Sequence, residues 1–368
     1  MLTTFKEKAR KASCLLLGVH SLAWRGLMGR RRHISLYFFS VGLWQSLLIF
    51  FDMLLPFRNA KKLRFKLSEE VSRRFDNIDS FLYSSARGAL ANCLTALELD
   101  KNDEVLLSTL TCLAVPTAVL AAGATPTYCD IDVHTLNMTP ELVLQQITKR
   151  TKVIIVQHTL GSIAPVEAIK ACLEGKGIFV LEDCALSYGS EHQGVPVGTQ
   201  GDAAILSMEL SKTLTSGWGG ILFVKHEELA LKVSKNYQLL PALSAIKSLR
   251  MAFQTALCGI FYMPSFYWLG KYGVALCFKL GLFRASTPDV EYTGGVSDDF
   301  VSKLARRQCV LALHQWRRVE QIMHPCIVNF LKFKVILTQL GYLPLGFSGE
   351  QVLAVSPRIA FLVKDRKR

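Results

Sequence analysis

The chain has 368 residues, of which 50% are apolar, and its 43 lysines and arginines outnumber its 29 aspartates and glutamates, giving a formal net charge of +14. This length and apolar content are typical of one large or two moderate globular domains with ample core. The ten cysteines are scattered without a CxxC pair, which argues against a disulfide scaffold or a clustered zinc site and favours a reducing cytosol.

The basic excess is concentrated near the chain ends, in runs at 6–11, 25–32, 61–66 and 364–368. No recognition-helix motif or interleaving of aromatic and basic residues accompanies these runs, so we do not expect nucleic-acid binding. Anionic lipid or a nucleotide diphosphate explains the same charge more economically.

Residues 34–57 are predicted to form an apolar helix that is about long enough to cross a bilayer. Gln45, Asp52 and several serines weaken a spanning helix, and no cleavage site typical of a signal peptide follows. Residues 239–286 mix aromatic runs with lysines and arginines around a proline break, as in a segment that lies on a membrane surface. For both segments a hydrophobic subunit interface is the alternative, and length and charge do not separate these interpretations.

The middle of the chain alternates strand and helix patterns, which predicts an α/β fold. The expected strands are continuous apolar runs, as in a sheet covered on both faces; they are 104–108, 125–130, 153–157, 178–182, 203–208 and 221–225. The expected helices are 87–99, 111–122, 139–147 and 164–173, with a further one at 302–322.

Lys212 and Asp183 are the residues with the clearest chemical meaning. Asp183 ends a short apolar strand, and Lys212 follows a later strand and precedes a glycine-rich turn at 216–220. A lysine amine can bond the aldehyde of pyridoxal 5'-phosphate (PLP), while a carboxylate can keep the pyridine nitrogen protonated so that the ring accepts electrons. The pair therefore predicts a PLP site, although an isolated pair of this kind is usually only surface charge.

Ordered motifs around this pair resemble the DegT/DnrJ/StrS family of PLP-dependent sugar aminotransferases. The resemblance extends from about residue 83 to 231 and, more weakly, over 297–325. It is carried by "DEV…AAGATP…DID" at 103–132, "ITKRTKVIIVQHTLG" at 147–161, "EDCA" at 182–185 and "GTQGD" at 198–202 leading to Lys212. The order and gaps of these blocks carry the resemblance; any single block would be weak.

The resemblance implies fold type I of the PLP-dependent transferases, with a mostly parallel sheet in a large domain and a smaller α+β domain from the chain ends. Lys212 would form the Schiff base and Asp183 would pair with the pyridinium. Ser207 would bind the cofactor phosphate. Residues Ser85, Ala86 and Arg87 replace the family's Ser-Gly-Thr turn, where a helix N-terminus offers backbone N–H groups to the phosphate; Ser85 would equally serve as an ordinary helix cap.

Two positions depart from the family pattern at the cofactor. Leu186 replaces a glutamine or histidine that bonds the phenolic oxygen, and Cys112 replaces the aromatic residue that stacks on the ring. His158 matches a family histidine but is equally expected as a buried structural residue. Cys184 is expected to be a small core residue.

We therefore expect an enzyme that moves an amino group from an amino acid, with glutamate the expected donor, to a keto group on a nucleotide-linked sugar of polysaccharide or lipopolysaccharide biosynthesis. One alternative is a sugar dehydratase of the same fold, although such relatives usually replace the lysine by histidine. Another is a membrane-associated scaffold that has lost turnover. A homodimer is expected, because family members generally form sites at a subunit interface.

The expected organisation has four parts. Residues 1–66 form a basic segment with an apolar helix, 67–238 the PLP-binding large domain, 239–290 an apolar and basic insertion facing a membrane or a partner, and 291–368 a short small domain. The expected location is the cytoplasm, with peripheral contact on the inner face of the cytoplasmic membrane.

Overall fold

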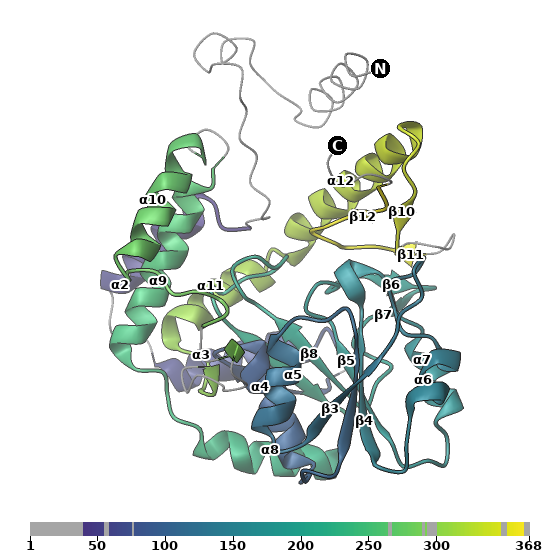
Figure 1. Ribbon diagram of the computed structural model, residues 1–368. Coiled ribbons are helices and arrows are strands. Elements are labelled where there is room, and N and C mark those ends of the chain that lie inside the picture. Colours follow the sequence, from purple (N-terminus) through teal and green to yellow (C-terminus); the bar gives the residue numbers. More distant parts are fainter. Residues whose placement is uncertain are drawn as a thin grey trace.

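The computed structural model describes residues 40–54, 59–75, 77–263, 267–288, 291–292, 300–346 and 352–363. Part of the predicted apolar helix 34–57 and three of the basic runs lie at least partly outside these ranges. The fold is built around one central sheet with helices on both faces (Figure 1).

The central sheet has seven strands in the order β1-β9-β8-β5-β4-β2-β3. Strands β8, β5, β4, β2 and β3 are parallel, whereas β9 runs antiparallel to both β8 and β1. The strands are β1 (Asp79–Tyr83), β2 (Glu104–Ser108), β3 (Thr125–Cys129), β4 (Thr151–Gln157), β5 (Phe179–Asp183), β8 (Ala203–Ser207) and β9 (Gly220–Val224). The six strands predicted from apolar runs are confirmed within two residues at each end, and the mostly parallel sheet is confirmed with them.

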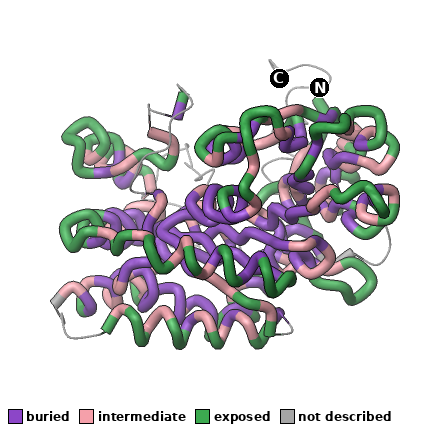
Figure 2. Tube along the Cα trace, turned by 90° about the horizontal axis from the view of Figure 1, so that it is seen from below, coloured by how far each residue is buried: buried purple, intermediate pink, exposed green. Residues whose placement is uncertain are grey.

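Helices cover the sheet because alternate residues of each strand point to opposite faces and both sets are apolar. On one face lie α4 (Ala86–Ala96), α5 (Ala114–Ala121) and α8 (Glu227–Leu239). On the other lie α3 (Ala60–Ser72), α6 (Pro140–Gln146), α7 (Val166–Cys172) and α11 (Arg306–Trp316). Figure 2 shows the buried segments running through the middle of the molecule, with exposed turns at its rim.

The predicted helix 302–322 is wrong in its extent. The structure has α11 (Arg306–Trp316) followed by a second helix, α12 (Val319–Gln339), with a break at Arg317–Arg318. Nothing in the local sequence marks this break, because neither proline nor glycine stands there. The break lets α11 stay against the sheet while α12 leads to short strands at the C-terminal side, β10 (Pro344–Leu345), β11 (Val352–Leu353) and β12 (Ala360–Phe361). Strand β11 pairs with β6 (Glu191–His192), which also pairs with β7 (Val195–Pro196).

The two apolar segments fold into helices that lie together on one side of the sheet (Figure 1). Helix α2 (Leu43–Leu54) packs on α9 (Ala245–Phe261), and α10 (Tyr267–Lys279) packs on the same α9. The Ser46 hydroxyl donates to the Ala256 carbonyl at 3.0 Å, which joins α2 to α9. Within the described residues, every helix is too short or too polar to cross a bilayer.

A buried ion pair fixes α2 to the start of α11. Arg306 Nη1 lies 3.0 Å from Asp52 Oδ1, and its Nη2 donates to the Asp52 carbonyl at 2.9 Å. Both side chains are largely shielded, with 13% and 4% of their surfaces exposed. Removing one member of such a pair leaves an uncompensated charge in a medium that solvates it poorly.

We predict that Arg306→Ala lowers the free energy of unfolding by about 3–5 kcal/mol, because Asp52 then loses its partner inside the protein. Urea unfolding of the purified protein measures this loss. The matched control is Arg317→Ala, whose pair with Glu70 is more exposed and should contribute only about 0–1 kcal/mol. Equal losses in the two variants would contradict this account of α2.

Candidate functional site

The candidate site lies at the carboxyl edge of the parallel strands. Asp183 is the last residue of β5, where it pairs with Gln157 of β4 and with Ile205 of β8. Lys212 follows β8 by five residues, in a turn that begins at Ser207. Ligand sites in open α/β sheets gather at this edge because successive parallel strands deliver their C-terminal residues to the same place.

Residues 207–216, here called the lysine turn, are held in place by hydrogen bonds within their own backbone. The N–H of Lys212 donates to the Glu209 carbonyl at 3.0 Å, and the N–H of Ser216 donates to the Met208 carbonyl at 3.0 Å. The side chain of Lys212 is half-buried. Among the described residues, its amine forms no hydrogen bond or salt bridge, so it is available to a ligand at the sheet edge.

Asp183 and Lys212 are near enough for their charges to interact. Burial raises the pKa of Asp183 above its ordinary value, while the Ala185 N–H and the charge of Lys212 act in the opposite direction. The Ala185 N–H donates to Asp183 Oδ1 at 2.9 Å. The carboxylate is thus enclosed with little direct hydrogen bonding, which leaves it able to pair with a cationic ligand atom.

The expected phosphate turn lies beside Ser207. Ser85 caps α4 by accepting from the Gly88 N–H at 3.0 Å, and its hydroxyl donates to the Phe300 carbonyl at 2.9 Å. Gly220 pairs with Ser207 across β8 and β9, and a Cβ on Gly220 would overlap the backbone nitrogen of Ala86. The absence of a side chain at Gly220 therefore lets the start of α4 approach the end of β8.

The first turn of α4 is suited to an anion. The N–H groups of Ala86 and Arg87 belong to the first turn, which lacks intrahelical acceptors. The positive end of the helix dipole points the same way. Because the hydroxyl of Ser85 is already committed to Phe300, the backbone is the better candidate for binding a phosphate here.

The Arg87 side chain turns away from this backbone. Its guanidinium forms an ion pair with Glu291, donates to the Ser286 carbonyl at 2.6 Å and lies 4.1 Å from the centre of the Phe300 ring. Burial lowers the pKa of Arg87 to about 10, and the nearby Arg284 acts in the same direction. Arg87 remains charged at neutral pH and links α4 to Ser286, Glu291 and Phe300.

The two positions that depart from the family pattern are also near the edge. Cys112 is exposed just before α5 and is close enough to Arg87 to influence its charge. Leu186 is half-buried, three residues beyond Asp183. Neither side chain offers the ring stacking or the hydrogen bond that the family pattern would place there.

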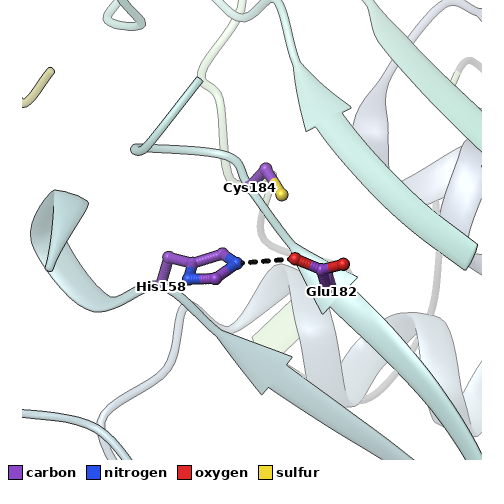
Figure 3. Close-up of side chains that lie close together, drawn as sticks. All are labelled: His158, Glu182 and Cys184. Carbon is purple, nitrogen blue, oxygen red and sulfur yellow. Dashed lines mark hydrogen bonds and ion pairs between the residues drawn. The ribbon is translucent and has the colours of Figure 1, made fainter. Parts of the chain in front are cut away.

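His158, Glu182 and Cys184 form a buried cluster behind the edge, with their potential ligand atoms all within 4.8 Å of one another (Figure 3). His158 Nδ1 accepts from the Ala164 N–H at 3.0 Å, so Nε2 of the neutral ring donates to Glu182 at 3.0 Å. Glu182 also accepts from the N–H groups of Gly198, Gln200 and Gly201.

This cluster is structural in character. Burial opposes ionisation of Glu182, but the His158 and backbone hydrogen bonds outweigh it and hold the pKa below its ordinary value. Burial raises the pKa of the Cys184 thiol well above its usual range, so the thiol keeps its proton. With the histidine and carboxylate already bonded, the cluster fastens the 198–201 loop to β4 and β5, in line with the structural interpretation of His158.

Two features of the edge were missed by sequence reasoning. Gln157 bonds Thr111 at 2.7 Å and the Leu110 carbonyl at 2.9 Å, which fixes the turn before α5 beside Asp183. Arg284 reaches the ring of Phe300 at 4.0 Å, next to α4. Gln157 could have been found from the sequence, because it is a polar residue at the end of an apolar strand. The sequence near Arg284 gave no such signal, because its contacts are with Gln254 and Phe300, which belong to other parts of the chain.

A larger open groove of about 760 Å³ lies at the opposite edge of the sheet. It is lined by residues that precede β5 and β8 or follow β9, among them Lys170, Asp202 and Lys225. Asp202 is already paired with Lys170 at 2.7 Å and with His226 at 3.2 Å. This groove is remote from Lys212 and takes no part in the candidate site.

Part of the chain is similar to known aminotransferases. Residues 69–244 match the DegT/DnrJ/EryC1/StrS aminotransferase family. The L-glutamine:2-deoxy-scyllo-inosose aminotransferase of Streptomyces paromomycinus is 37% identical over 150 residues, which are 41% of this chain and 35% of that protein. The chain thus spans about a third of the length of the curated relatives it matches.

Solved structures share the fold at low identity. The sugar aminotransferase CalS13 from Micromonospora echinospora has a TM-score of 0.67 at 18% identity, covering 91% of this chain and 82% of that one. The PMP form of a putative sugar aminotransferase, Spr1654, from Streptococcus pneumoniae has a TM-score of 0.60 at 20% identity, covering 87% and 77%. The expected fold type I architecture is therefore confirmed.

We predict that Glu182→Gln lowers the free energy of unfolding by roughly 2–4 kcal/mol above about pH 5, because the hydrogen bonds of a buried carboxylate are lost or weakened. The folded-state pKa of Glu182 lies below its ordinary value of 4.5, so its stabilising effect is complete above that pH and disappears as pH falls through the folded-state pKa. Urea titrations across acidic pH should show the gap between wild type and variant closing. Glu174→Gln, an exposed control, should show no such gap; a gap for Glu182→Gln that is independent of pH would contradict the assignment.

Proposed function

We propose that the protein is a PLP-dependent sugar aminotransferase, because residues 69–244 of the chain match the DegT/DnrJ/EryC1/StrS aminotransferase family. It transfers an amino group from an amino acid, with glutamate the expected donor, to a keto group of a sugar, for which a nucleotide carrier is expected from the family resemblance. The observation that carries the proposal is the proximity of Lys212 to the buried Asp183 at the carboxyl edge of the sheet.

The residues present fit the cofactor. The enclosed carboxylate of Asp183 would gain a positive partner from a protonated pyridine nitrogen, which offsets the burial that raises its pKa. The N–H groups of Ala86 and Arg87 and the hydroxyl of Ser207 would hold the phosphate at the start of α4. The half-buried amine of Lys212 would carry the covalent link.

When bound, PLP supplies an aldehyde for Schiff-base formation and a ring that accepts electrons. The protein would supply position and proton transfer. Asp183 would hold the proton on the ring nitrogen, and Lys212 Nζ would take and return the proton at the reacting carbon. Leu186 and Cys112 would leave the ring less tightly held than in the family pattern, since neither bonds or stacks on it.

The lysine also favours one of the family's reactions over the other. A sugar dehydratase of this fold is the second candidate, but Lys212 retains the amine that aminotransfer requires. A scaffold without turnover would need no half-buried lysine near Asp183, so both alternatives are less well supported by the site than aminotransfer.

We predict that the purified protein binds PLP covalently through Lys212, because its amine has no hydrogen bond or salt bridge to other described residues. Borohydride reduction followed by peptide mass spectrometry should locate the cofactor on Lys212, and Lys212→Ala should abolish the reducible adduct. Lys225→Ala, at the opposite edge of the sheet, is the matched control and should retain it. Conversion of the bound cofactor to pyridoxamine phosphate by glutamate then tests amino transfer; no conversion with any amino acid would favour the scaffold.

We also propose a homodimer and peripheral contact with the inner face of the cytoplasmic membrane. The contact would lie on α2 and on the α9–α10 hairpin, which belongs to the predicted insertion 239–290. Exposed side chains there include Trp44, Trp268, Leu269, Tyr272 and Leu276. Lys271 and Lys279 stand among those of α10. Cationic residues between aromatic and aliphatic ones favour a lipid surface over a purely apolar subunit contact.

We predict that the protein sediments with vesicles containing anionic lipid, and that salt weakens this binding because surface charge is screened. The double variant Leu269→Glu with Leu276→Glu should bind vesicles at least about tenfold more weakly, since charge is introduced into the apolar face. Leu231→Glu, on the exposed face of α8, is the control and should bind as the wild type does. A double variant that keeps vesicle binding but dissociates the dimer in size-exclusion chromatography would assign this face to a subunit interface.

A further inference from the structure

The C-terminal unit of the chain, formed by α12 with β10 and β12, has an exposed apolar surface of its own. Helix α12 buries one stripe of side chains at helical spacing: Val319, Met323, Cys326, Phe330 and Leu337. Positions away from such a stripe are usually polar. Leu331 and Val335, which are four residues apart and therefore neighbours on the helix surface, are instead apolar and 53% and 56% exposed. Helix α12 thus presents an apolar pair to solvent.

The short strands beside α12 add further exposed apolar side chains. Strand β12 pairs with β10, and the ring centre of Phe361 lies 5.2 Å from that of Tyr342, just after α12. Leu343 and Leu362, the sequence neighbours of these two rings, are 60% and 55% exposed. We refer to the four exposed aliphatic residues of this unit as the C-terminal patch: Leu331, Val335, Leu343 and Leu362.

The C-terminal unit is basic as well as apolar. Residues 321–349 contain no aspartate or glutamate, although the chain has 29 of them. The same residues include Lys332, which is exposed, and Lys334, while Arg358 is exposed next to β12. The α9–α10 hairpin has the same character, because residues 229–288 also contain no acid and have several lysines and arginines. Two separate parts of the chain therefore combine exposed apolar side chains with cations that have no acid nearby in sequence.

The two basic and apolar surfaces lie on the same side of the molecule. Figure 1 shows α10 at the upper left and α12 at the upper right, and both helices extend beyond the sheet toward the top of the view. Trp268, Tyr272 and Leu276 of α10 are 48%, 64% and 54% exposed, much as the residues of the C-terminal patch are. A single flat surface above the sheet can therefore touch both helices without a change in the fold.

The charge of the C-terminal patch favours lipid over other partners. In a two-fold dimer the same surface meets itself, so the lysines of one copy would face those of the other, and like charges oppose association. Nucleic acid would pair with the lysines, but proteins contact it mostly through hydrogen bonds to phosphate and sugar, which would leave the leucine and valine side chains in water. An anionic membrane surface suits both, because its headgroups pair with lysine and its acyl chains cover the apolar residues.

We propose that the C-terminal patch is a second contact with an anionic membrane surface, which acts together with the contact at α10. The inference rests on the proposed membrane association but places it on a different part of the chain. Two contacts on one protein bind the same surface, so the second adds affinity without a further loss of translational freedom. Together they also fix the orientation of the protein on the membrane, which one helix lying on lipid does not.

Sedimentation of the full chain with vesicles tests the second contact. The vesicles contain phosphatidylcholine with roughly a quarter phosphatidylglycerol, or phosphatidylcholine alone. Leu331→Ser with Val335→Ser removes apolar surface without adding charge, and it should weaken binding to the mixed vesicles by about tenfold. Lys332→Gln should weaken this binding by about fivefold, because each lysine near such a surface is attracted to it. The matched control is Leu120→Ser with Leu144→Ser, at positions 47% and 46% exposed on α5 and α6, which should bind as the wild type does.

The α10 variant, Leu269→Glu with Leu276→Glu, separates the second contact from the first. Each pair of substitutions should weaken binding by itself, and all four together should leave no more binding to the mixed vesicles than to phosphatidylcholine alone. Full binding by Leu331→Ser with Val335→Ser, beside loss in the α10 variant, would overturn the second contact and leave the first. Loss in Leu331→Ser with Val335→Ser alone would overturn the contact at α10 and support the second.

Other partners would give different results with the same variants. Dissociation of a dimer by Leu331→Ser with Val335→Ser, with vesicle binding retained, would assign the patch to a subunit interface. Binding of duplex DNA that is tighter than vesicle binding, and that only Lys332→Gln weakens, would assign it to nucleic acid. Either result overturns the inference.

Hydrogen exchange of the wild-type protein tests the contact without any substitution. The mixed vesicles should slow exchange of the backbone amides in 342–345 and 360–363, because lipid would exclude water from these segments, and should leave 140–146 on α6 unchanged. Slower exchange in α10 with no change in 342–345 and 360–363 would overturn the second contact. The conversion of bound PLP by glutamate needs no membrane, so none of these outcomes bears on the proposed aminotransfer.

Discussion

The candidate site depends on the contrast between two adjacent acids on β5. Glu182 accepts hydrogen bonds from His158 and from three backbone N–H groups, and it is held ionised. Asp183 points to the other side of the strand, where it accepts one backbone N–H and its pKa is raised by burial. A buried carboxylate with so few donors is stabilised by a cationic partner. The first acid therefore stabilises the fold, and the second is the one that we propose for a ligand.

Six strands of the central sheet were predictable because their runs are apolar on both faces, as expected of strands in a sheet that is covered on both sides. The proximity of Lys212 to Asp183 followed from the same alternation, since Asp183 ends one parallel strand and Lys212 lies shortly after the carboxyl end of its neighbour. The break between α11 and α12 was not predictable. Arg317 and Arg318 are compatible with a helix, and Pro325, the stronger local signal, lies inside α12. Packing against the sheet decides that boundary.

Charges were harder to place than hydrophobic residues. The sequence puts Arg87 in the expected phosphate turn, yet its guanidinium turns to Glu291 and Phe300, some two hundred residues further along the chain. Arg284 gave no local signal, because its position is set by Gln254 on another helix. The apolar segment 34–57 was likewise ambiguous: a helix that contacts lipid and one that packs on α9 present the same composition. The structure shows α2 packing one face on α9 and leaving Trp44 exposed.

The hairpin of α9 and α10 presents two faces with different surroundings. Its inner face packs on the lysine turn, where Leu210 lies in one cluster with Cys258 of α9 and Val274 of α10. Its outer face leaves Trp268, Tyr272 and Leu276 exposed. Whatever covers the outer face, a lipid surface or a second subunit, would therefore act on helices that also pack against the turn that carries Lys212.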